Sequence, residues 1–275
     1  MNTKLILAAS ALVVLSGCQM TNVIDDMPAD LTSFNVEWES EALKVHFSGG
    51  MLTEAKVVNA VDEFFSSRET SCEGPECMLT LGDGTTLVST FDQQSLLIVS
   101  NLGDLEMGED GTFNPHYTYA AIAPLFYGSI SSLPKGDLNY EGLMAYTASS
   151  DMDIPNLEEE NYFSDFDMEV NFDLMTARIV EGEGEQAMAY FDSGSLDIST
   201  DGTFIGTDGL LNEDPYKNKI YTHGSFTVDG SGVFGTFTSD GPFTSDGPFT
   251  SDDYPGEITF RGGFVGARAL DDGPG

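Results

Sequence analysis

Apolar and polar residues alternate most regularly between Phe166 and Leu174. Every even-numbered residue of this stretch is apolar, and every odd-numbered residue between them is Asp, Glu or Asn. A two-residue period is that of a β-strand with one solvent-exposed face, and no helix would separate these residues onto two faces. Because the apolar face of such a strand needs a second sheet or a closed barrel to cover it, we expect the neighbouring segments to pair with it.

The second half of the chain repeats this pattern in short segments. Ser131 to Gly136 interrupts the pattern and marks a boundary between two domains. Beyond it, strands are predicted at 138–146, 166–174, 177–180, 194–199, 202–206, 220–228, 232–237 and 258–270, with 177–180 as the hairpin partner of the 166–174 strand. About eight strands joined by short Gly, Asp and Asn turns predict an up-and-down β-barrel whose interior is filled with side chains.

The first half of the chain predicts a smaller, mostly β domain. Alternating residues at 34–38 and 43–47 predict one hairpin, and 78–91 predicts a second around an Asp-Gly turn. A continuous apolar run at 95–101 is typical of a strand covered on both faces. Between the hairpins, apolar residues spaced by three and four predict one helix over 53–68, with Thr53 as its cap.

The predicted fold class is therefore mainly β. An antiparallel eight-stranded barrel occupies residues 133–275, and a smaller domain with one helix occupies residues 33–132.

Charge narrows the range of partners. The chain has 46 acidic and 10 basic residues, for a formal net charge of −36. Such a polyanion would be repelled by phosphates, so nucleic acid is excluded as a partner. Most of the acidic residues are interpreted as keeping the surface soluble, and charged partners are expected to be basic proteins or cations. With 40% hydrophobic and 11% aromatic residues, the chain is expected to fold.

The amino terminus has the features of a secretory signal. Lys4 precedes an apolar run from Leu5 to Leu15, which is too short to span a bilayer as a helix. The run ends in Leu15-Ser16-Gly17-Cys18, which resembles the lipobox of bacterial lipoproteins. The alternative is an ordinary secretory peptide in which Cys18 has no special role.

The lipobox resemblance implies a signal peptide over residues 1–17 and a mature chain that begins at an acylated, palmitate-type Cys18. Because Gln19 rather than Asp follows the cysteine, the resemblance also implies anchoring in the outer membrane. Several acyl chains would hold the protein in the bilayer permanently. Residues 18–32 are polar and without periodicity, and are interpreted as a flexible tether.

Cys72 and Cys77 flank the sequence Glu-Gly-Pro-Glu. In an exported protein, two remaining thiols around a Gly-Pro turn favour a small disulfide. A metal site is the alternative, but two thiols without a nearby histidine or a second cysteine pair make a poor zinc site.

Several motifs of the second half occur in a recognisable order. They are Tyr140-Glu141-Gly142, the acid-alternating strand at 165–174, Gly-Thr-Phe-x-Gly at 202–206, Gly-Val-Phe-Gly-Thr-Phe at 232–237 and Gly-Gly-Phe-Val-Gly-Ala-Arg at 262–268. Together they resemble the β-barrel domain of transferrin-binding protein B and of the related factor H binding protein, over residues 136–270. The resemblance implies a lipid-anchored surface protein that captures a host protein or an iron or haem source through its loops and outer faces. It also implies that the first half is a handle-like domain.

Two features depart from that family. The chain has room for one barrel, whereas transferrin-binding protein B has two lobes. In addition, the hexapeptide Phe-Thr-Ser-Asp-Gly-Pro stands at 237–242 and again at 243–248. Its Pro and Gly content predicts an extended loop. The loop is interpreted either as repeat expansion in a tolerant segment or as a binding tip or weak calcium turn, and its few acids favour the former.

No catalytic arrangement is evident in the sequence. It contains no nucleophile elbow, no zinc-protease motif and no phosphate-binding glycine loop. His46, His116 and His223 are isolated along the chain. His116 beside Tyr117 and Tyr119, or His223 beside Tyr221, could serve as axial haem ligands, but exposed or hydrogen-bonded histidines are the favoured interpretation.

The sequence therefore predicts a monomeric, non-enzymatic, surface-exposed outer-membrane lipoprotein without a resident cofactor or metal. The bilayer is one partner, through Cys18, and a protein or a haem or iron carrier is the other. The alternative is a structural envelope lipoprotein that captures no ligand.

Overall fold

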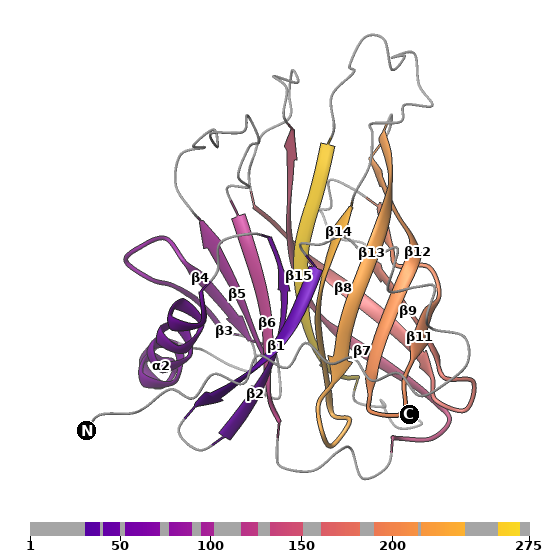
Figure 1. The fold of residues 1–275 in the computed structure, drawn as a ribbon, viewed down its shortest axis with the longest axis horizontal. Helices are drawn as coiled ribbons and strands as arrows, with labels where there is room; N and C mark the ends of the chain where they lie inside the picture. Colours follow the sequence, from indigo (N-terminus) through magenta and orange to yellow (C-terminus); the bar gives the residue numbers. More distant parts are fainter. Residues whose placement is uncertain are drawn as a thin grey trace, which may run out of the picture.

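The fold is that of a computed structural model, which describes residues 31–38, 41–49, 53–71, 77–89, 95–101, 117–125, 133–150, 161–181, 190–213, 216–239 and 258–269. Within these ranges the chain is mainly β and has one helix, as predicted. Figure 1 shows three layers side by side: the helix, an open sheet and a barrel.

The first half forms an antiparallel six-stranded sheet, here called the handle sheet. Its order is β1-β2-β6-β5-β4-β3. The strands are β1 (Leu31–Trp38), β2 (Glu41–Ser48), β3 (Cys77–Thr80), β4 (Thr86–Ser89), β5 (Leu96–Asn101) and β6 (Tyr117–Leu125). Both predicted hairpins and the strand covered on both faces are confirmed. The alternation predicts no strand at β6, yet β6 joins β2 to β5 in the middle of the sheet.

Helix α2 (Glu54–Ser71) covers the outer face of the handle sheet (Figure 1). Val57, Ala60, Val61 and Phe64 recur at spacings of three and four, and all four are buried against that face. Apolar residues at this spacing form one stripe along a helix, which explains why this segment does not become a strand. No helix among the described residues is both long enough and apolar enough to cross a membrane.

Thr53 caps α2, because the Lys56 amide donates to the Thr53 side-chain oxygen at 3.3 Å. Replacing Thr53 by alanine is expected to lower the free energy of unfolding by about 1 kcal/mol, the usual cost of losing such a cap. Thr53→Ser keeps the hydroxyl and should retain most of the stability. Chemical denaturation of both variants measures the difference, and equal losses would show that the hydroxyl does not cap the helix.

The second half closes into an antiparallel barrel. Its strands are β7 (Asp137–Ser150), β8 (Tyr162–Asn171), β9 (Thr176–Glu181), β10 (Tyr190–Asp192), β11 (Leu196–Ile198), β12 (Thr203–Glu213), β13 (Tyr216–Phe226), β14 (Gly232–Ser239) and β15 (Ile258–Arg268). β10 and β11 both pair with β9 and with β12, so they act as one interrupted strand of an eight-stranded barrel. Pairing of β12 with β13 closes the ring.

Aromatic side chains fill the interior of the barrel. Those buried there are Tyr140, Tyr146, Phe166, Phe172, Phe191, Phe204, Phe226, Phe237, Phe260 and Phe264. Phe204 and Phe264 stack with ring centroids 6.2 Å apart, and Phe264 meets Phe166 edge-on at 5.5 Å. Each fully buried aromatic ring stabilises the fold by about 2 kcal/mol through removal from water. The inside of the barrel is thus a packed aromatic core.

Strand β8 confirms the alternation from which the barrel is predicted, but it ends earlier than expected. Phe166, Met168 and Val170 are buried, whereas the acids between them are exposed. The strand ends at Asn171, and residues 172–175 form the turn to β9, in which Phe172 is still buried. Leu174 is therefore 72% exposed instead of lying on the apolar face. The Leu174 amide donates to Asn171 Oδ1 at 2.7 Å, which fixes the turn at that point.

The handle sheet packs on the barrel wall formed by β14 and β15, with a contribution from β7 (Figure 1). The apolar part of this junction includes Leu97, Tyr119 and Ala121 from the handle sheet and Phe234 and Val265 from the barrel. Polar contacts cross it too: the Tyr119 hydroxyl donates to Asn161 Oδ1 at 2.8 Å, and the Ser48 hydroxyl donates to the Phe237 carbonyl at 3.2 Å.

Candidate functional site

The barrel carries its charged side chains mainly on the outside, because the aromatic core occupies the inward positions. Strand alternation sends Asp165, Asp167 and Glu169 of β8 to the exposed face. On the neighbouring strand β7, Glu141 lies opposite Asp167 and is also exposed. Like charges directly across strands are unfavourable, so this wall is negatively charged at some cost to the stability of the sheet.

A groove of about 680 Å³ lies on the same wall. Its lining comes from β7, β8, β9, the end of β10 and the segment between β10 and β11, and consists of Asp137, Asn139, Glu169, Val170, Asn171, Thr176, Ala177, Arg178, Asp192, Gly194 and Ser195. Most of these residues carry carboxylate, amide or hydroxyl groups. We define this groove as the candidate site.

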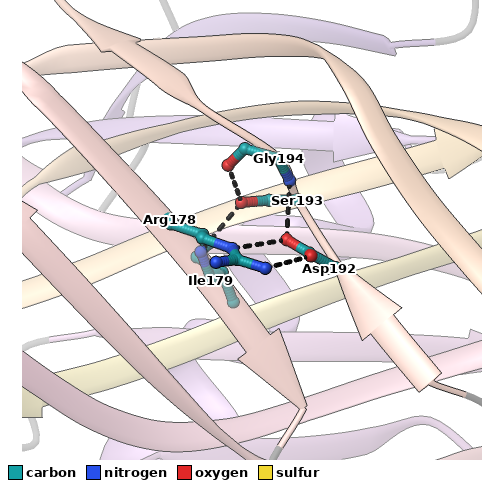
Figure 2. Close-up of polar contacts among 5 residues, drawn as sticks. All are labelled: Arg178, Ile179, Asp192, Ser193 and Gly194. Carbon is teal, nitrogen blue, oxygen red and sulfur yellow. Dashed lines mark hydrogen bonds and ion pairs between the residues drawn. The ribbon is translucent and has the colours of Figure 1, made fainter.

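Arg178 is the basic residue of the groove, and Asp192 holds it in place. Figure 2 shows the guanidinium of Arg178 directed at the carboxylate of Asp192. Arg178 Nε donates to Asp192 Oδ1 at 2.9 Å, and Arg178 Nη2 donates to Asp192 Oδ2. The hydrogen bond from Arg178 lowers the pKa of Asp192, and the Gly194 amide, which donates to Asp192 Oδ1 at 2.9 Å, lowers it further.

Ser193 attaches the segment between β10 and β11 to β9 (Figure 2). The Ser193 hydroxyl accepts from the Ile179 amide at 2.8 Å and donates to the Gly194 carbonyl at 2.9 Å. In the other direction, the Ser193 amide donates to the Ile179 carbonyl at 2.8 Å. Two-way bonding of this kind fixes the position of Asp192 beside Arg178, and with it the floor of the groove.

The groove is rich in hydrogen-bond acceptors. Asp137 Oδ1 accepts from the side-chain Nδ2 of Asn171 at 2.7 Å, and Glu169 lies opposite Arg178 in the pairing of β8 with β9. Carboxylate oxygens favour ammonium, guanidinium and backbone amide donors, so the groove suits a polar or basic segment better than an apolar ligand. Charge and shape of this kind are typical of recognition at a protein surface.

Several residues named from the sequence lie outside the described residues. These are Cys18, Cys72, His116 and the second copy of the hexapeptide repeat. Cys77 begins β3 and is 2% exposed. Lipidation of Cys18 and pairing of Cys72 with Cys77 stay predictions.

His46 and His223 are not isolated, contrary to the expectation from the sequence. They are 177 residues apart along the chain, yet their Nδ1 atoms lie 3.3 Å from each other at the junction between the handle sheet and the barrel. His46 and His223 thus have the hydrogen-bonded surroundings that the favoured interpretation describes.

No group of three or more metal-binding side chains occurs in the described ranges.

Glu181 is an unusual acid because it points into the barrel. It is 8% exposed, its Oε1 accepts from the Tyr146 hydroxyl at 3.3 Å, and its Oε2 has no hydrogen-bond partner among the described residues. Burial raises the pKa of this carboxyl, although hydrogen bonds from neighbouring hydroxyls partly oppose the shift. A charged carboxylate at this position is costly to the fold.

Glu181→Gln is therefore expected to gain stability relative to the wild type as the pH rises. A raised pKa in the folded state means that the wild type loses stability as pH increases above the unfolded pKa of Glu, whereas glutamine does not ionise. The gain between pH 4 and pH 7 should be of the order of 1 kcal/mol. Urea denaturation of both proteins at the two pH values measures it, and a pH-independent difference would contradict the assignment.

No protein-family model matches the chain, and no curated protein matches it in sequence. Solved structures do match the chain in fold. The chain is similar to transferrin-binding protein B and to the haemoglobin receptor HpuA. A transferrin-binding protein B from Haemophilus parasuis has a TM-score of 0.45 and 10% identity, over 74% of this chain and 39% of that one. The isotype 1 protein from Neisseria meningitidis has a TM-score of 0.46 and 8% identity, over 74% and 36%.

HpuA from Kingella denitrificans, in complex with human haemoglobin, has a TM-score of 0.35 and 11% identity, over 91% of this chain and 92% of that one. The chain spans about two fifths of the length of these two transferrin-binding protein B structures. At these identities the likeness concerns the fold alone.

Proposed function

We propose that this protein is a non-catalytic outer-membrane lipoprotein, anchored through an acylated Cys18 and displayed at the cell surface. It captures a protein or an iron- or haem-carrying ligand on the outside of its barrel. Residues 18–32 serve as the tether, 33–132 as the handle-like domain and 133–275 as the barrel domain. The lipobox-like sequence before Cys18 supports the anchor.

One observation carries the binding role: an acceptor-rich groove opens on the outer wall of a barrel whose inside is a packed aromatic core. A ligand carrier that uses its lumen needs space there, whereas this barrel offers contact on its exterior. The handle sheet packs against β14 and β15, and the groove lies on β7, β8 and β9. A bound protein could therefore approach the groove while the handle sheet stays docked.

Surface display is tested by adding a protease to intact cells that express the lipidated full chain. The proposal expects the protein to be degraded while a periplasmic control protein stays intact. Survival of the protein until the outer membrane is permeabilised would refute display. Capture of envelope components alone would favour the structural alternative.

The groove is tested by Arg178→Ala, which should strengthen the capture of a basic ligand, because it removes the positive charge of the groove and frees acceptor sites on the Asp192 carboxylate. Arg178 is 52% exposed, so its ion pair should contribute less than about 1 kcal/mol to stability. Lys219→Ala removes an exposed positive charge on β13, outside the groove, and serves as the control. Equal capture by both variants would place the contact elsewhere.

A further inference from the structure

The junction between the handle sheet and the barrel has a polar edge built around two imidazoles. His46 projects from β2 toward the barrel, on the same face as Lys44 and Ser48. His223 projects from the outer face of β13, together with Ser225. The two rings meet edge-on, with centroids 4.4 Å apart.

Both ring nitrogens of His46 are engaged with the barrel. Its Nδ1 lies 3.3 Å from His223 Nδ1, and its Nε2 lies 2.9 Å from the Ser225 hydroxyl oxygen. The ring also contacts Phe234, at a centroid distance of 5.2 Å, and His46 is 0% exposed. An imidazolium formed here would have little water to hydrate it.

The facing Nδ1 atoms share one hydrogen bond, so one of them must donate while the other accepts. If both rings become imidazolium ions, each Nδ1 carries a proton, so the bond is lost and two positive charges face each other across the junction. Lys44 adds a third positive charge from β2, and Asp201, in the turn between β11 and β12, provides a negative one. The neighbouring positions on β1, β6 and β14 are Ser33, Ala121 and Thr236, which carry no charge.

The pKa values follow this arrangement. Burial lowers the pKa of His46 well below its usual range, and His223 and Lys44 lower it further. Burial likewise lowers the pKa of His223 to about 4, with Lys44 acting in the same direction and Asp201 against it. Both rings are therefore neutral in the docked junction at pH 7 and resist protonation as long as it stays closed.

We propose that the His46–His223 pair is an acid-sensitive latch, which holds the handle sheet against the barrel at neutral pH and releases it under mildly acidic conditions. The energetic reason is linkage: an open junction exposes the imidazoles and binds protons that the closed junction excludes. Each histidine exposed at an ordinary pKa of 6.5 would increase the opening constant about 30-fold between neutral pH and pH 5.

The latch is tested with a thiol placed under the handle sheet of the full chain. Ala121 faces the barrel, is 0% exposed and lies opposite His46 in the pairing of β2 with β6. The rate at which 4,4′-dithiodipyridine modifies an Ala121→Cys protein is measured from pH 7.5 to pH 5, and the background from the native cysteines is subtracted. This rate is divided by the rate for a Ser66→Cys protein, in which the thiol is exposed. This ratio cancels the pH dependence of the thiol reaction.

The ratio is expected to rise about 30-fold or more on acidification. In a His46→Gln, His223→Gln background the rise should disappear, because glutamine can keep a hydrogen bond but does not take up a proton. The chain has three histidines, so His116→Gln is a matched control that should retain the rise. If the double variant does not fold, Lys44→Gln provides an independent test: without this charge the closed junction takes up protons more easily, so the rise on acidification should be smaller than in the wild type.

A ratio that stays constant from pH 7.5 to pH 5 would overturn the proposal. So would an undiminished rise in the double histidine variant, or a rise in Lys44→Gln that exceeds that of the wild type.

Discussion

Replacing Phe264 by alanine is expected to lower the free energy of unfolding by about 3–5 kcal/mol, the usual cost of removing a buried aromatic ring. Phe264 is 0% exposed and sits between Phe166 and Phe204 in the barrel core. Its removal leaves a cavity in the layer where β8, β12 and β15 meet, and a closed ring of strands can collapse only partly to fill it. Urea denaturation followed by near-ultraviolet circular dichroism measures the loss.

Leu174→Ala is the matched control for this substitution. Leu174 is 72% exposed at the turn after β8, so truncation should change stability by less than about 0.5 kcal/mol. Similar losses for the two variants would mean that Phe264 is not part of a packed interior. The barrel would then have space for a ligand, and the case for binding on its outer wall would fail.

Replacing Gly142 by alanine is expected to destabilise the barrel by about 3 kcal/mol or to prevent its closure. A Cβ at Gly142 would lie 2.2 Å from the Val265 carbonyl oxygen, 2.5 Å from Gly266 Cα and 2.9 Å from a Phe166 ring carbon. Two of these atoms belong to the backbone of β15, which pairs with β7 at this point. The added methyl group can be accommodated only if the two strands separate.

Gly82→Ala provides the comparison, because a Cβ at Gly82 would have no atom within 4 Å. This variant should unfold at the same denaturant concentration as the wild type. If Gly142→Ala also does so, β7 and β15 do not approach each other as closely as the barrel requires.

Much of the fold could be predicted because one physical signal dominates it. Residues on β8 and β9 alternate between a buried and an exposed face, and a two-residue period is visible without knowledge of the partners. β6 and β10 lack that signal: β6 is covered on both faces, so its small apolar residues do not alternate, and β10 has only three residues. The end of β8 was missed for a related reason, since Phe172 and Leu174 continue the alternation into a turn.

The candidate site is harder to predict, because it depends on which strands become neighbours. Arg178 and Asp192 meet only when β10 pairs beside β9. The alternation does place Glu169 and Arg178 among the outward-facing residues of the β8–β9 hairpin. This is the one sequence signal that indicates the outer wall of the barrel. The His46–His223 contact leaves no trace in sequence spacing, because docking of two separate sheets creates it.

The most direct test of outer-wall capture is a comparison of two charge reversals that alter the net charge equally. Glu169→Lys changes the groove, and Glu63→Lys changes an exposed position on α2. Each full-length protein is displayed on cells and incubated with fluid from the organism's surroundings, and the ligand retained by the wild type is quantified by mass spectrometry. We predict at least about a tenfold loss for Glu169→Lys, which corresponds to about 1.4 kcal/mol of binding free energy, and wild-type capture for Glu63→Lys. Equal capture by the two variants, or no ligand retained by the wild type beyond envelope components, would contradict the account.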